Sequence, residues 1–485
     1  LGNADQARSI VRRLIWGDDA APDDVTLSKL RQLVIRSYLA DKDLDDAQSA
    51  VIRYRLDYPK DAGDWPLLEA RLFLRAQQPQ SALEVLKGSK GDAAEMLKLL
   101  AGLRAGSIDP GDALARAVAI GTSDKAALEK RIQAWAVAAE AADDLKNPLA
   151  RIRALQYGLG LQPGLLAKDD LFALTPDMLW DAYLAYGQDL GNQLQLVVGD
   201  DQGWFLAASN KFDSDAVSAC ALFSVVAFNA VEPHQRDVAH WQFATLIQKQ
   251  RDGSNILRHL YLDSSRFTTP ESVPSDVRYI LVNDVLDISD IPLASRLMQG
   301  LDAPPPDTDP AAWHLQRARI FVLGGRPDAG VKVLDALFKS GAGFNPGDVL
   351  PVLFDLQTIG RDKDAIPFFE AILNGSLQDE QRRQLLYWTA DSYKALGDYA
   401  KAAELYLRSA TLTNPYAMDQ WAQTSRYQAA RMLTKAGLVD DARRLYKGLL
   451  NATRDPARQA VLRHDMQQLL LAPDSQHGLG TGTHQ

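Results

Sequence analysis

Two histidines and one cysteine are the side chains of this sequence best suited to metal or nucleophilic chemistry. His234 and His240, in EPHQRDVAHWQ, lie six positions apart, whereas two metal ligands on one face of a helix are three or four apart. Cys220 lies in an apolar run, AVSACALFSVVAFNAV, where a free cysteine behaves as a small hydrophobic residue. We therefore expect no catalytic residue, no metal and no cofactor, and we predict that the protein is not an enzyme.

Three pairs of adjacent aspartates, at positions 143–144, 169–170 and 200–201, have the residue types of an acid and a base. Adjacent acids in front of a helical stretch are more simply helix caps, because their carboxylates accept hydrogen bonds from free backbone N–H groups. We predict capping for all three pairs, with Asp201 capping the helix that follows LQLVV. For residues 192–209 the alternative to helices is a β-hairpin.

The glycines of YGLGLQPG, residues 157–164, have the wrong interval for a dinucleotide-binding loop and follow a helical stretch. We interpret this segment as a plain loop. The sequence also contains no phosphate-binding loop, nucleophile elbow or metalloprotease helix motif. Residue types that carry chemistry are thus present without the spacing that would make them act together.

The composition is that of an ordered protein, since 46% of the 485 residues are hydrophobic and 24% are charged. A chain of this length exceeds what a single hydrophobic core supports, so several domains or a long repeat array are expected. The formal net charge of −9 argues against nucleic acid as a partner, because a polyanion repels an acidic chain. The single cysteine excludes an intramolecular disulfide.

The most apolar run, residues 216–231, is shorter than the about 18 uninterrupted apolar residues of a membrane-spanning helix, so we predict no transmembrane segment. The sequence begins at Leu1 without a methionine, and NADQARSIVRRLI looks like the second helix of a hairpin whose first helix is missing. Such a start, one cysteine and the polar tail at residues 473–485 fit a bacterial periplasmic protein. A cytoplasmic location is the alternative.

A repeated pattern in the C-terminal third indicates the elements that position the polar residues. Each copy has a turn glycine, a small residue five positions later, and an aromatic or aliphatic residue four positions after that. The copies are Gly325/Gly330/Leu334, Gly360/Ala365/Phe369, Gly397/Ala402/Tyr406 and Gly437/Ala442/Tyr446. Their turn positions are 35, 37 and 40 residues apart, which is the period of a solenoid of helical hairpins. Glycine suits the left-handed turn, and the small residue lets the second helix cross closely.

The same register occurs elsewhere without the turn glycine. The small residue of the second helix is then Ala7, Ala47, Ala82 or Ala294. Between Ala82 and Ala294 the period is lost, although the apolar spacing remains close to that of a helix. Within this stretch, residues 109–121 and 147–160 look like degenerate second helices. We therefore predict an all-α chain with an irregular middle section.

This pattern resembles the tetratricopeptide repeat (TPR) family, whose units have small residues at the helix crossing, a glycine at the turn and often a closing proline. The family's first-helix aromatic position is held here by Tyr38, Phe73, Phe321 and Tyr393. The resemblance covers residues 1–87 and 276–452. It implies a right-handed superhelical solenoid of antiparallel helix pairs, which binds partners in a concave groove without catalysing a reaction.

The resemblance and the break in the period divide the chain into four predicted parts. N-terminal TPR-like repeats, with a truncated first hairpin, are predicted over residues 1–120. An irregular helical-repeat section follows over 121–275. C-terminal TPR repeats are predicted over 276–470 and a flexible tail over 471–485.

In a stack of hairpins of this family the first helices line the groove, and the register names the residues that face it. Six residues before each turn position the sequence has Arg36, Arg71, Asn283, Arg319, Phe354, Asp391 and Arg431. Ten residues before it, tyrosines stand at Tyr279, Tyr387 and Tyr427. Arginine beside tyrosine favours binding of carboxylates or other anionic groups, with stacking on the rings. The alternative is that these arginines pair with Asp or Glu of a neighbouring hairpin.

We expect a non-enzymatic scaffold or adaptor that binds protein or peptide partners, anionic ones favoured, in bacterial envelope assembly. The alternative is the helical glycan-binding part of a polysaccharide-export machine, or of a cell-wall machine of the lytic transglycosylase type. No lysozyme-like catalytic segment is present in the sequence. Reversing Arg319 and Arg431 to Glu is expected to abolish partner binding and to leave the helix content intact.

Overall fold

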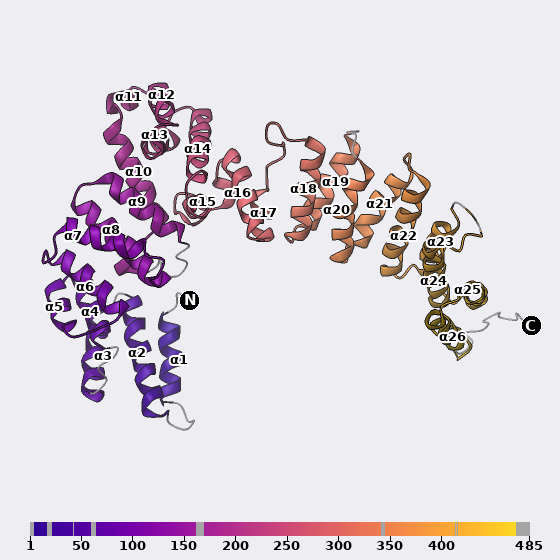
Figure 1. Ribbon diagram of the computed structural model, residues 1–485, viewed down its shortest axis with the longest axis horizontal. Helices are drawn as coiled ribbons and strands as arrows, with labels where there is room; N and C mark the ends of the chain where they lie inside the picture. The colour runs from indigo at the N-terminus through magenta and orange to yellow at the C-terminus, as the bar shows by residue number, and fades with distance from the viewer. Residues whose placement is uncertain are drawn as a thin grey trace, which may run out of the picture. The chain divides into compact units, whose positions relative to one another are not determined.

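The computed structural model describes residues 4–16, 22–41, 43–59, 65–161, 169–340, 345–412, 414 and 416–471. Within these ranges the chain is all-α and contains no strand, which confirms the predicted class. Consecutive helices pack against each other, an arrangement consistent with a repeat solenoid (Figure 1). No helix in these ranges has both the length and the apolar character that a membrane span needs. The predicted tail lies outside the described residues, apart from Leu471.

The chain divides into two compact units, Leu1–Asp284 (unit 1) and Val285–Gln485 (unit 2), and each is described by itself. The helices of unit 1 are α1 (Ala4–Trp16), α2 (Asp24–Ala40), α3 (Leu44–Asp57), α4 (Trp65–Arg75), α5 (Pro79–Val85), α6 (Asp92–Arg104), α7 (Pro110–Gly121), α8 (Leu128–Asp144), α9 (Pro148–Gly160), η2 (Asp170–Phe172), α10 (Pro176–Leu190), α11 (Gln193–Val197), α12 (Asp201–Lys211), α13 (Ala216–Asn229), α14 (Pro233–Gln248), α15 (Gly253–Arg258), η3 (His259–Asp263) and η4 (Pro270–Ser272). The boundary between the units falls within α16 (Ser275–Asp287).

Unit 2 continues the alternation of first and second helices. Its helices are α17 (Ile291–Leu297), α18 (Pro310–Leu323), α19 (Pro327–Lys339), α20 (Pro346–Thr358), α21 (Asp362–Leu373), α22 (Asp379–Ala395), α23 (Tyr399–Thr411), α24 (Gln420–Lys435), α25 (Val439–Ala452) and α26 (Pro456–Leu471). Each of α18 to α25 packs on the next helix along the chain, apart from the pair α19 and α20, where α18 and α20 pack on each other.

In unit 1 the regular hairpins occupy the N-terminal half. The first helices α2, α4, α6 and α8 each pack on the following second helix, and α2, α4 and α6 also pack on the next first helix. Beyond α9 this order changes, because α10 packs on α13 and α15 returns to α9. Residues 193–197 form the short helix α11, so the helical alternative for this stretch is confirmed and the β-hairpin is wrong.

The turns between paired helices share one backbone conformation. All four turn glycines of the repeat have a positive φ, between 75° and 82°. At the equivalent positions of two other hairpins, Gln77 and Ser289 take φ values of 56° and 62°. Each turn is closed by a backbone hydrogen bond between residues five positions apart, such as the bond of 2.8 Å from the N–H of Arg361 to the carbonyl of Leu356. These are Schellman turns, in which a residue with left-handed backbone ends the first helix.

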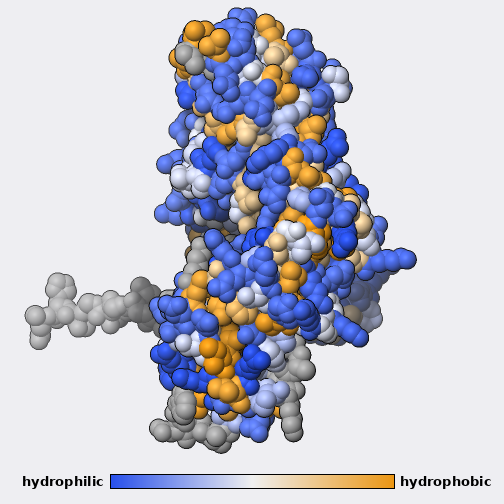
Figure 2. Space-filling model, turned by 90° about the vertical axis from the view of Figure 1, so that its left-hand side faces the viewer, coloured by the Kyte–Doolittle hydropathy of each residue, from blue (hydrophilic) through white to orange (hydrophobic). Residues whose placement is uncertain are grey.

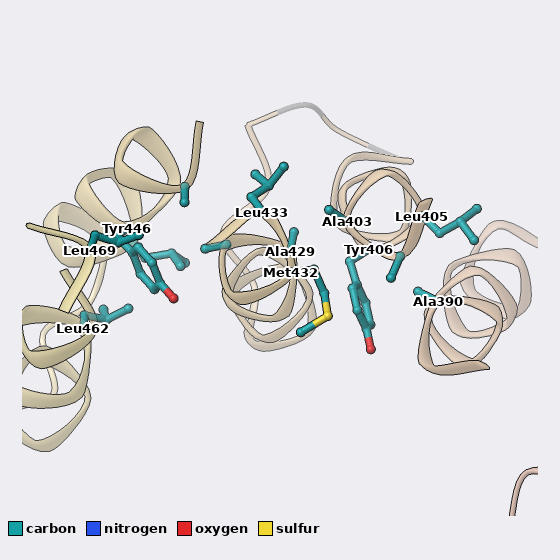
Figure 3. Packing of buried hydrophobic residues seen from close by; sticks show 14 of the residues in the cluster. Ala390, Ala403, Leu405, Tyr406, Ala429, Met432, Leu433, Tyr446, Leu462 and Leu469 are labelled. Atoms are coloured by element: carbon teal, nitrogen blue, oxygen red, sulfur yellow. The ribbon is translucent and has the colours of Figure 1, made fainter. Parts of the chain in front are cut away.

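The core of unit 2 follows the register of small and large residues. Figure 3 shows the ring of Tyr406 between Ala390 of α22 and Met432 of α24. Tyr406 is fully buried and Tyr446 nearly so, with 2% of its surface exposed. Alanines at the crossings leave the space that these rings fill, so the small and aromatic positions of the repeat stabilise each other.

Candidate binding surface

Successive first helices of unit 2 each carry an aromatic residue of the predicted groove. Phe354 lies on α20, Tyr387 on α22 and Tyr427 on α24, and all three are half-buried. The ring of Phe354 meets Trp388 edge-on, with centroids 4.9 Å apart, and Tyr387 contacts Trp421 at 5.2 Å. Aromatic side chains of successive hairpins thus contact one another, and we call Phe354, Trp388, Tyr387, Trp421 and Tyr427 the aromatic row.

Two tyrosines of the aromatic row keep their protons at neutral pH. The Tyr427 hydroxyl donates a hydrogen bond of 3.0 Å to Oδ2 of Asp465. Burial, and next this carboxylate, raise the pKa of Tyr427. Burial also raises the pKa of Tyr387. The guanidinium of Arg431 lies 5.9 Å from the centroid of the Tyr427 ring, so a cation and a tyrosine from the predicted set come together on α24.

Two charged residues of the predicted set, Arg319 and Asp391, are bonded to other side chains of the chain itself. Nε of Arg319 donates to Oδ2 of Asp355, one hairpin further along, at 2.7 Å. Asp391 accepts hydrogen bonds from Lys394 and from the Tyr406 hydroxyl. The pairing between neighbouring hairpins that the sequence left open is therefore present at Arg319. Arg431 has an exposed side chain, as Arg319 does.

A pocket of about 340 Å³ lies among α24, α25 and α26, and Tyr427 forms part of its wall. The pocket is lined by Gln423, Thr424, Tyr427, Leu449, Thr453, Ala457, Arg458, Val461 and Leu462. Leu449 and Leu462 are buried, whereas 49% of Val461 is exposed. An apolar pocket of a few hundred Å³ with a few polar groups has the size of a site for a small ligand or for one or two side chains.

The predicted residues of unit 1 lie on three helices. Arg36 is exposed on α2, and Arg71 lies on the neighbouring α4. Nη1 of Arg71 donates to Oδ2 of Asp169 at 2.7 Å. Tyr279, half-buried, and Asn283, exposed, lie on α16. Arg71 therefore has an acidic partner from its own chain, as Arg319 does.

Sequence reasoning missed a cluster of ion pairs in unit 1. Arg75 binds Asp170 with Nε at 2.9 Å and Nη2 at 2.6 Å, and Arg104 binds Glu140 with two bonds of 2.7 and 2.9 Å. Arg75, Arg104, Glu140 and Asp170 line a pocket of about 690 Å³. The available signal was the four-residue interval between Arg71 and Arg75, which places both on one helix face. Their partners lie almost one hundred residues later in the sequence.

The capping predictions hold only in part. Asp169 caps η2 by accepting from the N–H of Leu171, and Asp200 caps α12. Asp201 was predicted as that cap, but it is the first helical residue, and its carboxylate accepts from the N–H of Val231 at 2.6 Å. The prediction for residues 143–144 is wrong, because α8 ends there and Asp143 pairs with Arg151.

The loop predicted over residues 157–164 is wrong in its first half. Helix α9 continues to Gly160, and residues 162–164 lie outside the described residues. A Cβ at Gly158 would lie 2.6 Å from Cδ1 of Leu174 and 3.2 Å from Cβ of Trp135, so neighbouring side chains approach the helix closely at this residue. The glycines that suggested a loop therefore allow close packing of a helix.

His240 and Cys220 are buried in a cluster of aromatic rings. Nδ1 of His240 lies 2.9 Å from the Tyr261 hydroxyl, and the imidazole is edge-on to Phe228. Burial lowers the pKa of His240 to about 3 and raises the pKa of the fully buried Cys220 thiol. His234 is exposed. A neutral imidazole and a protonated thiol inside a core have the properties of structural residues.

The described residues contain no group of three or more His, Cys, Asp or Glu side chains arranged to hold a metal ion. Models of known protein families give no match to this sequence, and neither do curated proteins. The function is therefore inferred from the residues of the chain and their geometry.

Proposed function

We propose that this chain is a non-enzymatic scaffold of the TPR type, which binds a peptide segment of a protein partner along the first helices of unit 2. The observation that supports this most is the aromatic row, whose half-buried rings lead from α20 to α24 and end at the pocket lined by Tyr427. Half-buried aromatic side chains give contact area at low entropic cost, because they are already held by their neighbours.

The bound segment has an apolar anchor and at least one carboxylate. The pocket offers buried leucines for the anchor, and Arg458 on its wall and Arg431 beside Tyr427 are cations that a carboxylate can reach. Arg458 has a distant partner, since its Nε lies 3.7 Å from Asp455 and both side chains are about half exposed. An exposed pair of this kind costs little to exchange for a ligand carboxylate.

A glycan is the second candidate ligand, and the tryptophans of the row favour it. Trp388 and Trp421 are half-buried, and flat apolar rings flanked by polar side chains also stack on sugar rings. In this alternative the chain is the helical part of a polysaccharide-export or cell-wall machine. The right-handed superhelix, the bacterial envelope and the periplasm belong to the proposal through the resemblance to TPR proteins and the sequence features noted above.

The test compares both ligand classes on the full-length chain. A random peptide library and a panel of soluble peptidoglycan fragments and anionic polysaccharides are screened, and hits are measured by calorimetry. We expect peptides with an apolar and an acidic residue, and at least a tenfold loss of affinity, about 1.4 kcal/mol, in Tyr427→Ala and in Arg431→Glu. Selection of glycans alone would favour the alternative.

The matched control is Arg251→Glu, because Arg251 is 80% exposed and lies in unit 1. This variant makes the same charge change at a residue that is not part of the aromatic row or of its pocket, so its affinity should equal that of the wild type. Arg319→Glu is a less clean test, because it would set a second carboxylate beside Asp355. Unchanged affinity in the double variant of Arg319 and Arg431 would show that this surface does not bind the ligand.

A further inference from the structure

A short segment between α9 and α10 lies against first helices from earlier in the chain. It consists of residues 169–172, Asp-Asp-Leu-Phe, and we call it the DDLF segment. Its helix η2 packs on α4 and on α8. Only 4% of Leu171 and 1% of Phe172 are exposed, whereas on the face of unit 1 in Figure 2 hydrophobic residues lie at the surface among hydrophilic ones. The segment therefore buries two apolar side chains although it belongs to no helical hairpin.

The acidic half of the DDLF segment is bound by two arginines of α4. Nη1 of Arg71 donates to Oδ2 of Asp169 at 2.7 Å. Arg75 donates three hydrogen bonds to the two carboxylate oxygens of Asp170, the shortest of 2.6 Å from Nη2. Charge-assisted bonds of this kind are the strong ones among side-chain contacts. The segment thus contacts the helices through two carboxylates and two apolar side chains, as a bound peptide does.

The arginine that binds Asp170 has a counterpart on the next first helix. Arg75 precedes Gln77 by two residues and Arg104 precedes Gly106 by two, and both turn residues have a left-handed backbone, with φ values of 56° and 66°. Arg104 binds Glu140, which belongs to the first helix α8. A helix of the stack thus supplies the carboxylate at one arginine, and a connecting segment supplies it at the other.

Open space lies beside the DDLF segment. Asp170 and Leu171 line a pocket of about 690 Å³ and another of about 250 Å³, and both pockets also include Arg104 and Glu140 in their walls. The side chain of Asp170 is 37% exposed and that of Asp169 is 21% exposed. A second carboxylate can therefore approach the arginines of α4 from these pockets while the segment is still bound.

We propose that α4 and α8 form a binding site for a short segment of a protein partner, and that the DDLF segment occupies this site as a competitor within the chain. The partner segment has two adjacent acids followed by two apolar residues, because these are the groups that the site already binds. The proposal lies within unit 1 and does not rest on the aromatic row.

An exchange of this kind conserves the contacts of the site. Each ion pair and each apolar contact of the DDLF segment is replaced by one of the same type. The balance is then set mainly by the effective concentration of the tethered segment, which is on the order of millimolar for short flexible connections. Weakening the DDLF segment should therefore strengthen the binding of a partner segment.

A fluorescein-labelled peptide of residues 169–174, DDLFAL, serves as the probe, and its binding to the full-length chain is measured by fluorescence anisotropy. We expect the double variant Asp169→Asn, Asp170→Asn to bind it at least tenfold more tightly than the wild type. Asparagine keeps the size of the side chain and can still cap η2, and it removes the negative charge. Adding Arg75→Glu to the double variant should weaken binding at least tenfold.

The matched control is the double variant Asp440→Asn, Asp441→Asn. These aspartates are also adjacent and paired with arginines, Arg443 and Arg444, but they lie on α25 in unit 2. The affinity of the control should stay within about twofold of the wild type. The peptide NNLFAL is the control for the ligand, and it should bind the Asp169 and Asp170 variant at least tenfold more weakly than DDLFAL does.

Hydrogen exchange tests the competition in the wild type, without a substitution in the segment. At about 10 mM peptide, above the effective concentration of the tethered segment, the amides of residues 169–174 should exchange faster than without peptide. Unchanged exchange would overturn the proposal. Equal affinity of the wild type and the Asp169 and Asp170 variant would also overturn it, as would the absence of saturable binding to that variant up to about 1 mM peptide.

Discussion

The hydroxyl of Tyr406 on α23 donates a hydrogen bond of 2.5 Å to Oδ1 of Asp391 on α22. The two residues belong to the two helices of one hairpin, and both positions recur in the repeat. Tyr406 is fully buried, and burial, followed by this carboxylate, raises its pKa. The bond therefore joins the core of the hairpin to the side of α22 that carries the aromatic row.

Removing this hydroxyl should destabilise unit 2. Tyr406→Phe leaves the ring in place and takes one donor from Asp391, whose side chain is 30% exposed. Because hydrogen bonds to charged groups contribute about 1.5–3 kcal/mol, we expect a loss near the lower end of that range in urea denaturation. Tyr393→Phe is the control, since its bond to Glu370 is exposed, and it should change stability by less. Equal losses of stability in the two variants would show that the buried hydrogen bond contributes no more than the exposed one.

At the left-handed turn positions, removing a glycine should lower the stability of the protein and introducing one should raise it. Gly397 has a φ of 82°, and a Cβ there would meet no atom within 4 Å, so Gly397→Ala should cost about 1–2 kcal/mol through backbone strain alone. Gln77 adopts the same conformation without being a glycine, and Gln77→Gly should stabilise the protein by up to about 1 kcal/mol. Chemical denaturation of both variants checks this. Loss of stability in Gln77→Gly would mean that its side chain contributes more than the strain costs.

The helix crossing at Gly330 should not tolerate even one methyl group. A Cβ at this residue would lie 2.6 Å from Cγ2 of Val322 and 2.8 Å from the carbonyl oxygen of Ala318. We expect Gly330→Ala to destabilise unit 2 by about 1–3 kcal/mol, as overpacking does. Gly448, where a Cβ would meet nothing within 4 Å, is the control, and Gly448→Ala should stabilise α25 by about 1 kcal/mol. A neutral Gly330→Ala would show that the two helices can separate freely.

The buried His240 should make the protein less stable in acid. Its pKa is about 3 in the folded chain, below the value of 6.5 for an exposed histidine, so between these values only the unfolded chain takes up the proton. Stability is complete above pH 6.5 and falls with decreasing pH by about 1.4 kcal/mol per unit for this one group. Denaturation of His240→Gln between pH 7 and 4 should show a smaller slope. His234→Gln, at an exposed site, should leave the slope unchanged.

The local features of the fold were predictable because they depend on neighbouring residues. The second helices begin where the register places them, and the turn glycines have the left-handed backbone that their spacing required. The contact of Arg319 with Asp355 was predictable as an alternative, because the two residues are one repeat apart and a stack of hairpins brings them together. The contacts of Phe354 with Trp388 and of Tyr387 with Trp421 follow from the same rule, because they also join residues about one repeat apart.

The interactions that join distant segments could not be predicted in this way. Asp169 and Asp170 contact Arg71 and Arg75 across almost one hundred residues, and no local period encodes this pairing. The capping prediction for residues 143–144 was wrong for a related reason. The sequence of two adjacent acids does not show whether they lie at the N-terminal or the C-terminal end of a helix. Whether a carboxylate caps a helix or binds a cation depends on which groups the chain brings near it.

The order of residues along the chain was enough to establish the all-α class, the helical hairpin as its unit, and the residues that cross or fill each hairpin, since a period of 35 to 40 residues repeats one local solution. The accessibility of each side chain, in contrast, emerged from the packing of the folded chain. Burial depends on what packs over a residue, so Ala7 and Ala47 share one register position and yet differ, one exposed and the other covered by a neighbouring helix.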